Sequence, residues 1–203
     1  MNSKLVEYAR LLKAWPGLVS RAEAAEPLVS DCLVLLRHIE AHDKVADVGS
    51  GGGMPGIPLK IMLPRLDLTL IESDQSKAAF LVATVARLEL SGVTVIAERA
   101  EIVARSPLRD AFDAVCCRAL AGPAVAAELC LPLVRPGGRA LLMTSGLAPT
   151  GSVARRLGGG EPVRVPAPSG LRERGSVVIV TKLEPTPDRF PRRPGIALKR
   201  PLS

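Results

Sequence analysis

The pattern of hydrophobic and polar positions changes near residue 44. From there, short apolar segments alternate with segments whose apolar residues recur at helical spacing. This pattern predicts strands at residues 44–49, 66–73, 93–99, 111–118, 139–145 and 176–183. It predicts helices at residues 56–63, 76–90, 123–134 and, more weakly, 150–156, with a turn at Pro136-Gly137-Gly138 before the fifth strand. Such alternation is typical of an α/β fold, a mostly parallel sheet with helices on both faces.

The first forty residues follow a different pattern. Leu5, Tyr8, Leu12 and Trp15 recur at helical spacing, and Pro16-Gly17 ends that segment. A second, leucine-rich helix is predicted over residues 26–40. We expect three parts in one unit: a short N-terminal helical cap at 1–40, a core at 41–184 and a basic Pro/Arg-rich tail at 185–203.

The composition fits a single compact domain. The chain has 203 residues, of which 47% are hydrophobic, which is enough to fill one core. No apolar run reaches about 18 residues, and the N-terminal segment carries charges throughout, so neither a membrane span nor a signal peptide is indicated. We therefore expect a cytoplasmic protein.

Four cysteines and two histidines occur without a Cys-x-x-Cys pair, which does not fit a zinc site. Cys116 and Cys117 are adjacent within an apolar run, where free cysteine usually behaves as a small core residue. We therefore expect reduced structural thiols and no metal.

The formal charge of +7 is unevenly placed. The stretch 185–203 has one carboxylate, Asp188, and five cations: Arg189, Arg192, Arg193, Lys199 and Arg200. Its prolines are expected to keep it extended and solvated. Such a stretch attracts a polyanion, most plausibly the backbone of a nucleic acid, although a solvated tail that aids solubility fits the charge equally well.

A glycine-rich corner follows the first predicted strand of the sheet. Its spacing, Asp47-x-Gly49-x-Gly51-x-Gly53, resembles that of S-adenosylmethionine enzymes. Gly51-x-Gly53-x-x-Gly56 also satisfies the dinucleotide fingerprint, so a nicotinamide enzyme is an alternative, and a turn without a ligand is another. Glycines let the backbone turn tightly against a ligand, and the helix that follows points free N–H groups at the same place.

Acidic residues follow the next two predicted strands. Glu72 stands at the tip of the second strand, where a carboxylate can accept hydrogen bonds from both hydroxyls of a ribose, although a solvated acid is the alternative. Glu101 follows the third strand in the same way. The Ala100 backbone and Glu101 are candidates for an adenine edge, and a carboxylate at a helix N-terminus is the competing interpretation.

Arg118 ends the fourth predicted strand, and open α/β sheets bind ligands at that edge. An arginine there is costly to desolvate unless it has an anionic or planar partner. Arg118 is therefore the candidate catalytic residue, and a salt bridge to a surface carboxylate is the alternative.

Five segments together resemble the bacterial glucose-inhibited division protein B family. They are residues 47–58 (Asp-Val-Gly-Ser-Gly-Gly-Gly-Met-Pro-Gly-Ile-Pro), 71–77 with Phe80-Leu81, 99–101 (Arg-Ala-Glu), 118–121 (Arg-Ala-Leu-Ala) and the tail 186–195. The resemblance covers most of the chain after residue 40. It implies a Rossmann-like class I methyltransferase that transfers a methyl group from S-adenosylmethionine to N7 of a guanine in small-subunit ribosomal RNA. The implied partner is the small ribosomal subunit, and the implied state is a monomer.

Matching positions imply donor contacts by Gly49, Gly51, Gly53, Met54, Glu72, Ala100, Glu101 and Arg118. The sequence departs from the family in the part that would face the acceptor. An Asn-Leu-Thr element, a histidine of the second helix and a lysine after the fifth strand are replaced by residues 17–20 (Gly-Leu-Val-Ser), Leu28 and Ser145. Two alternatives therefore remain: a methyltransferase with another substrate, and a non-catalytic ribosome-associated binder that retains the donor pocket.

The chemistry at N7 of guanine needs no general base, because that nitrogen is a lone-pair nucleophile with no proton to lose. Both histidines lie away from the strand edges, and no Asn-Pro-Pro-Tyr element of adenine amino methyltransferases occurs. Cys130 lies within a predicted helix, which makes it a poor nucleophile for the methylation of a pyrimidine carbon. Aromatic residues make up 2% of the chain, so phosphate contacts are expected to supply most RNA affinity and to make it salt-dependent.

Overall fold

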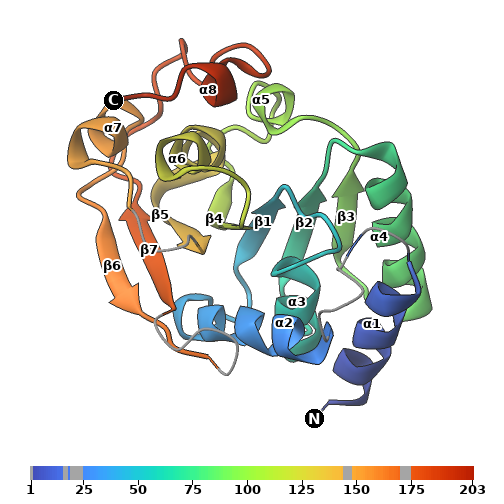
Figure 1. Cartoon of the computed structure of the whole chain (residues 1–203). Helices are drawn as coiled ribbons and strands as arrows, with labels where there is room; N and C mark the ends of the chain where they lie inside the picture. Colours follow the sequence, from blue (N-terminus) through green and yellow to red (C-terminus); the bar gives the residue numbers. More distant parts are fainter. Residues whose placement is uncertain (1, 16–17, 19–24, 144–147, 170–174) are drawn as a thin grey trace.

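The computed structural model describes residues 2–15, 18, 25–143, 148–169 and 175–203. In these residues a seven-stranded sheet has the order β3-β2-β1-β4-β5-β7-β6 (Figure 1). Strands β1 to β5 are parallel, and β7 and β6 add antiparallel pairs beside β5. The strands are β1 (Lys44–Val48), β2 (Asp67–Ile71), β3 (Val93–Ile96), β4 (Phe112–Arg118), β5 (Val134–Met143), β6 (Val163–Pro166) and β7 (Ser176–Thr181). The predicted α/β class is confirmed.

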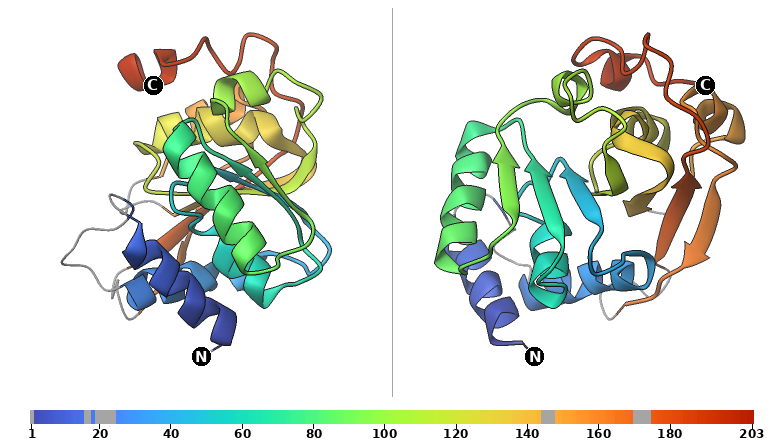
Figure 2. Two further views of the ribbon diagram at one scale, coloured as in Figure 1. Left: turned by 90° about the vertical axis from the view of Figure 1, so that its right-hand side faces the viewer. Right: turned by 180° about the vertical axis from the view of Figure 1, so that it is seen from behind.

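Helices lie on both faces of this sheet. The first group is α1 (Ser3–Ala14), α2 (Ala25–Cys32), the 3-10 helix η1 (Leu33–His38), α3 (Gly56–Met62) and α4 (Gln75–Arg87). The second group is α5 (Ala100–Val103), α6 (Pro123–Cys130), the 3-10 helix η2 (Leu131–Leu133), α7 (Gly151–Arg156) and α8 (Ile196–Lys199). Figures 1 and 2 place α1 and α2 at the opposite end of the molecule from α8.

Two predicted helices are shorter than expected. The helix predicted over 26–40 is α2 followed by η1, and the one predicted over 123–134 ends at Cys130 before η2. Pro132 explains the second break, because proline supplies no backbone N–H and its ring clashes with the preceding turn of an α-helix.

The predicted turn at residues 136–138 lies inside β5, which corrects the expected start of that strand. Val134 pairs with Phe112, and the register then shifts until Arg139 pairs with Ala114. Gly137 has a φ of +83° within this irregular stretch. The pattern therefore located the glycines correctly but missed the short pairing before them, and it also missed β6.

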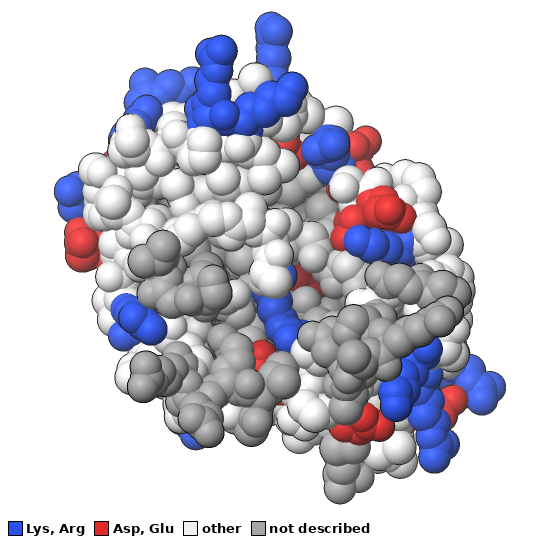
Figure 3. All heavy atoms as spheres, viewed as in Figure 1, with Lys and Arg blue, Asp and Glu red and all other residues white. Residues whose placement is uncertain are grey.

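The C-terminal tail folds against the domain, so the expected extended and solvated tail is wrong. Phe190 is 2% exposed, and Arg109 donates hydrogen bonds to the carbonyl oxygens of Phe190 and Thr186. The fully buried Glu128 of α6 accepts two hydrogen bonds from the Arg192 guanidinium, at 2.8 and 2.6 Å. In Figure 3 the blue cations nevertheless gather over the C-terminal end of the chain.

A buried lysine also links the tail to the sheet. Lys182 is fully buried, and its ammonium group donates to Asp110 and Thr186 at 2.8 Å each and to the carbonyl oxygens of Leu131 and Val134. Burial lowers the pKa of this lysine, and Asp110 opposes the shift. The first half of the tail is therefore anchored at Thr186 and at Arg192.

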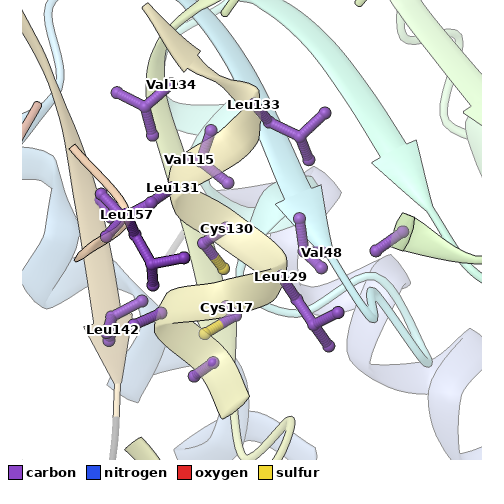
Figure 4. Packing of buried hydrophobic residues seen from close by; sticks show 14 of the residues in the cluster. Val48, Val115, Cys117, Leu129, Cys130, Leu131, Leu133, Val134, Leu142 and Leu157 are labelled. Carbon is purple, nitrogen blue, oxygen red and sulfur yellow. The ribbon is translucent and has the colours of Figure 1, made fainter. Parts of the chain in front are cut away.

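The core follows the alternation of side chains along the strands. In β1, Ala46 and Val48 face the cluster beneath α5 to α8, whereas Val45 faces the cluster beneath α1 to α4. Figure 4 shows Cys117 of β4 and Cys130 of α6 within the first cluster. All four cysteines are buried without disulfides, as expected for structural thiols.

The N-terminal helix packs directly onto the glycine corner. Tyr8 is fully buried, and its hydroxyl donates a 2.6 Å hydrogen bond to the Gly52 carbonyl oxygen. A Cβ on Gly52 would lie 2.7 Å from a methyl group of Leu12. The N-terminal helices therefore form part of the wall around the corner.

None of the described helices combines the length and apolar character that a membrane-spanning segment requires.

The anchored tail makes a prediction about stability. Arg192→Ala leaves the buried Glu128 carboxylate without its guanidinium partner, so the free energy of unfolding should fall by about 3 kcal/mol. Arg193→Ala, at the exposed neighbouring position, should change it by less than about 0.5 kcal/mol. Urea unfolding of the two variants checks this, and equal losses would contradict the anchoring role.

Candidate functional site: the glycine corner and the strand ends

The glycine corner connects β1 to α3 through backbone conformations that favour glycine. Gly49, Gly51 and Gly53 have φ angles of +68°, +56° and +94°. The amides of Gly49 and Ser50 donate to the Ile71 carbonyl oxygen of β2 at 2.9 and 3.1 Å. The corner is therefore fixed against the end of the neighbouring strand.

Gly51 has open space where a side chain would project. Among the described residues, a Cβ on Gly51 would have the Gly49 carbonyl oxygen, at 3.9 Å, as its nearest neighbour. A Cβ on Gly49 would clash with a methyl group of Leu120, and a Cβ on Gly53 would lie 2.5 Å from a methyl group of Ile57. Glycine at positions 49 and 53 therefore leaves room for the side chains of Leu120 and Ile57, whereas Gly51 borders open space that could admit a ligand.

Glu72 holds the corner from the tip of β2. Glu72 is only 7% exposed. One carboxylate oxygen accepts from the Gly51 amide and the other from the Asp74 amide, each at 2.8 Å. An ionised carboxylate offers about four acceptor sites, so positions remain for the two hydroxyls of a ribose.

Asp47 lies fully buried beneath the corner. Its Oδ2 accepts a 2.9 Å hydrogen bond from the Gly56 amide at the start of α3. Its Oδ1 has no hydrogen-bond partner among the described residues. Burial raises the pKa of Asp47 to about 7, and the nearby Glu72 charge adds to the shift.

Arg118 lies at the carboxyl end of β4, with its side chain 17% exposed. Its Nε lies 3.6 Å from the carboxylate of the buried Asp31, and its Nη1 lies 3.3 Å from the Met54 sulfur. The structure therefore shows the ion pair of the alternative interpretation, and Arg118 also borders the corner. The partner is a buried carboxylate and not the expected surface one.

These residues surround a pocket of about 380 Å³, a volume within the range of small-molecule sites. The pocket is lined by Gly49, Ser50, Gly51, Gly52, Met54, Glu72, Ser73, Lys77, Arg118, Ala119 and Leu120. Five of the predicted contact residues therefore come together. Gly53, Ala100 and Glu101 are not part of this lining. Glu101, in the first turn of α5, accepts a 2.8 Å hydrogen bond from the Gly195 amide of the tail.

Several lining residues were missed by sequence reasoning. Ser73 and Lys77 follow Glu72 around the turn into α4, whose N-cap Asp74 accepts from the Lys77 amide at 3.0 Å. Ala119 and Leu120 follow Arg118, and Ala119 has a φ of +50°. Positive φ at alanine is uncommon and cannot be inferred from the sequence pattern. The available signal was that these residues lie next to Glu72 and Arg118 in the sequence.

The structure describes some of the positions at which the sequence departs from the family in the part that would face the acceptor. Leu28 lies on α2, and its carbonyl oxygen is 3.5 Å from the Arg118 Nη1. Ser145 and residues 17 and 19–20 lie outside the described residues.

A larger hollow of about 510 Å³ lies between α4 and β3. Its lining is mostly aliphatic, with Val82, Val85, Leu90 and Val93 among the residues, and it lacks the converging polar groups of the corner pocket. Because ligands of open α/β sheets bind at the carboxyl ends of the strands, the smaller pocket is the better candidate site.

The described residues contain no cluster of histidine, cysteine and carboxylate side chains that could hold a metal ion. The cysteines are also poorly suited to nucleophilic attack. Burial raises the pKa of the Cys32 thiol to about 12, and a hydrogen bond with Cys117 and burial raise that of Cys130.

The family model described as rRNA small subunit methyltransferase G matches residues 1–149. A ribosomal RNA small subunit methyltransferase G of Rubrobacter xylanophilus is 41% identical over 218 aligned positions, covering 98% of this chain and 83% of that protein. One from Roseiflexus castenholzii is 42% identical, covering 98% and 91%.

Solved structures share the fold at low sequence identity. A mutant of MtNAS in complex with S-adenosylmethionine matches with a TM-score of 0.62 at 18% identity, covering 90% of this chain and 73% of that one. TrmN from Thermus thermophilus matches with a TM-score of 0.60 at 16% identity, covering 90% and 53%. These matches agree with the predicted Rossmann-like class I methyltransferase fold.

The raised pKa of Asp47 makes a prediction about stability and pH. Folding raises this pKa from an ordinary 3.8 to about 7. As the pH rises, Asp47 therefore loses its proton in the unfolded chain before it does in the folded protein, and the wild-type protein should lose stability between about pH 4 and 7. Asp47→Asn keeps an acceptor for the Gly56 amide without ionising. Its stability relative to wild type should therefore rise through this window, by at most about 1.4 kcal/mol per pH unit, and level off above it. Denaturation at several pH values without ligand checks this, and a pH-independent difference would contradict it.

Proposed function

The chain belongs to the rRNA small subunit methyltransferase G family, and we infer from that membership that it is an S-adenosylmethionine-dependent ribosomal RNA methyltransferase. We propose that it methylates N7 of a guanine in 16S ribosomal RNA. The observation that carries the proposal is the corner pocket, in which the open side of Gly51, the Glu72 carboxylate and Arg118 meet at the ends of three parallel strands.

The pocket has groups that suit S-adenosylmethionine, which supplies the transferable methyl group when bound. The open space at Gly51 lets a ligand lie against the backbone. The remaining acceptor positions of Glu72 suit the ribose hydroxyls. The planar guanidinium of Arg118 suits the carboxylate of the donor or the acceptor base.

We propose direct donor contacts for Gly49, Gly51, Met54, Glu72 and Arg118, all of which line the pocket. Gly53 is proposed to act through the shape of the corner, because its own Cβ position faces Ile57.

Ala100 and Glu101 are proposed to meet the adenine edge through their backbone at the start of α5, after β3. The Glu101 carboxylate has another task, because it holds the Gly195 amide of the tail.

The chain's own contribution to the reaction is alignment. Since N7 carries no proton, no side chain has to remove one, and placing the two reactants in line can lower the barrier by roughly 7–11 kcal/mol. In this account Arg118 is the catalytic residue and acts by position and charge.

The proposed partner is ribosomal RNA in the small subunit, bound in the cytoplasm by a monomer. We propose that residues 41–184 bind the donor, that residues 1–40 complete the pocket wall, and that residues 185–203 contact the RNA backbone. Four tail cations are exposed: Arg189, Arg193, Lys199 and Arg200. In Figure 3, blue Lys and Arg side chains gather at the end of the molecule where Figure 1 labels α8. A folded basic surface of this kind suits phosphates without reading bases.

Methyl transfer to small subunits that lack the modification tests the function. Labelled donor, purified protein and mapping of the product nucleotide should reveal one N7-methylguanine in 16S RNA. Label at another nucleotide would support the alternative of a methyltransferase with a different substrate. Tight donor binding without any transfer would support the non-catalytic binder.

The pocket assignment predicts the effect of filling the space at Gly51. Asparagine tolerates positive φ better than most residues, so Gly51→Asn should place a side chain in the pocket and weaken S-adenosylmethionine binding at least about tenfold, which is about 1.4 kcal/mol. Gly195→Asn is the matched control, because Gly195 also has a positive φ, +80°, and open space around its Cβ position. Calorimetry of both folded variants checks this, and equal affinities would contradict the assignment.

The basic surface predicts a change in salt dependence. Replacing Arg193, Lys199 and Arg200 by glutamine should lower RNA affinity and reduce the slope of log affinity against log salt by up to about 3, because each phosphate contact contributes about one. Donor binding should not change. An unchanged slope would reduce the tail to a structural and solubility element.

A further inference from the structure

A buried carboxylate lies behind the catalytic arginine. Asp31 of α2 is fully buried, and its Oδ2 lies 3.6 Å from the Nε of Arg118. Its other oxygen accepts a 2.5 Å hydrogen bond from the Ser169 hydroxyl, which follows β6. Asp31 therefore links α2, the end of β4 and the segment after β6, three parts of the chain that are distant in sequence.

The remaining contacts of Arg118 fix one side of its guanidinium. Nη1 lies 3.5 Å from the Leu28 carbonyl oxygen, 3.3 Å from the Met54 sulfur and 3.9 Å from the Cys32 sulfur. Within the described part of the chain, Nη2 has no hydrogen-bond partner. The contacts are therefore concentrated on Nε and Nη1, and one edge of the guanidinium remains available to a ligand in the pocket that Arg118 lines.

We propose that Asp31 is a positioning residue that holds the Arg118 guanidinium in its orientation at the pocket. The inference rests on the proposed function, since it specifies how the catalytic residue of that function is held. Arginine has several rotatable bonds, and fixing them in advance spares the reaction that entropic cost. A buried negative charge also offsets the cost of desolvating the guanidinium.

The Arg118–Asp31 pair differs in geometry from a tightly bonded structural pair. The structural pair of Arg192 and Glu128 has an N···O distance of 2.6 Å with two directed hydrogen bonds. The Arg118–Asp31 separation of 3.6 Å is an ion pair without a short directed bond. Arg118 therefore keeps hydrogen-bonding capacity for another partner, which a merely structural arginine would not need.

The test compares Asp31→Asn with a matched control. Asparagine keeps the shape and an acceptor for Ser169 but removes the charge. Asp43→Asn changes another partly buried pair, in which Asp43 lies 2.7 Å from Arg139. At saturating donor and RNA, folded Asp31→Asn should have a kcat at least about tenfold lower, and Asp43→Asn should leave kcat unchanged.

A double-mutant cycle separates positioning from fold support. Arg118→Lys should also lower kcat at least about tenfold, because lysine lacks the planar fork. The double variant Asp31→Asn with Arg118→Lys should lose little beyond Arg118→Lys alone, since Asp31 acts through Arg118. Fully additive losses, or an unchanged kcat in Asp31→Asn, would overturn the proposal.

A measurement without donor or RNA keeps the inference separate from the proposed function. The Arg118 guanidinium should show restricted side-chain motion by NMR relaxation in the wild-type protein, and Asp31→Asn should increase that motion. Should Asp31→Asn fail to fold, a freely mobile Arg118 guanidinium in the wild-type protein would itself overturn the proposal. Failure of wild-type methyl transfer with a restricted Arg118 guanidinium would count against the function and not against the positioning by Asp31.

Discussion

The pocket depends on the hydrogen bonds that the Glu72 carboxylate accepts from two backbone segments. One oxygen holds the Gly51 amide of the corner, and the other holds the Asp74 amide at the turn into α4, each at 2.8 Å. Hydrogen bonds to an ionised acceptor are stronger than neutral ones, and burial increases the cost of breaking them. A single side chain at the tip of β2 thus sets the separation of two walls of the pocket and leaves acceptor positions for a ligand.

The N-terminal helices are a second constraint on the same site. Tyr8 reaches the Gly52 carbonyl oxygen from α1, and Asp31 reaches Arg118 from α2. A segment that resembles a cap in the sequence is therefore in contact with both the glycine corner and the proposed catalytic residue. This arrangement connects the first forty residues to the proposed site through side chains outside the glycine motif.

Local signals were sufficient for most of the fold and part of the site. The strands and the glycine corner could be predicted because short apolar runs and glycine-rich turns are encoded within a few residues. The short pairing at Val134 and the fold of the tail depend on partners distant in sequence, such as Phe112 for the strand and Glu128 for the tail. Pattern reasoning therefore described the tail by its charge and prolines and missed that Phe190 is buried.

The same distinction holds within the site. Glu72 and Arg118 could be identified because they end strands of a parallel sheet, and the carboxyl ends of such strands meet at one edge. Asp31 could not be identified in that way, because nothing near it in the sequence indicates that α2 brings it to Arg118. The topology also leads to the expectation of Glu101 at this edge, but it does not indicate that the Glu101 carboxylate accepts a hydrogen bond from the Gly195 amide of the tail.

The most direct test of the central claim, that the corner held by Glu72 binds S-adenosylmethionine, is calorimetric titration of the donor into wild-type protein and Glu72→Gln. The glutamine amide group would face a backbone N–H, so one of the two hydrogen bonds must be lost and the corner should loosen. Donor affinity should fall at least about tenfold, whereas the exposed Glu98→Gln control should bind as wild type does. Equal affinity of Glu72→Gln and wild type would contradict the account.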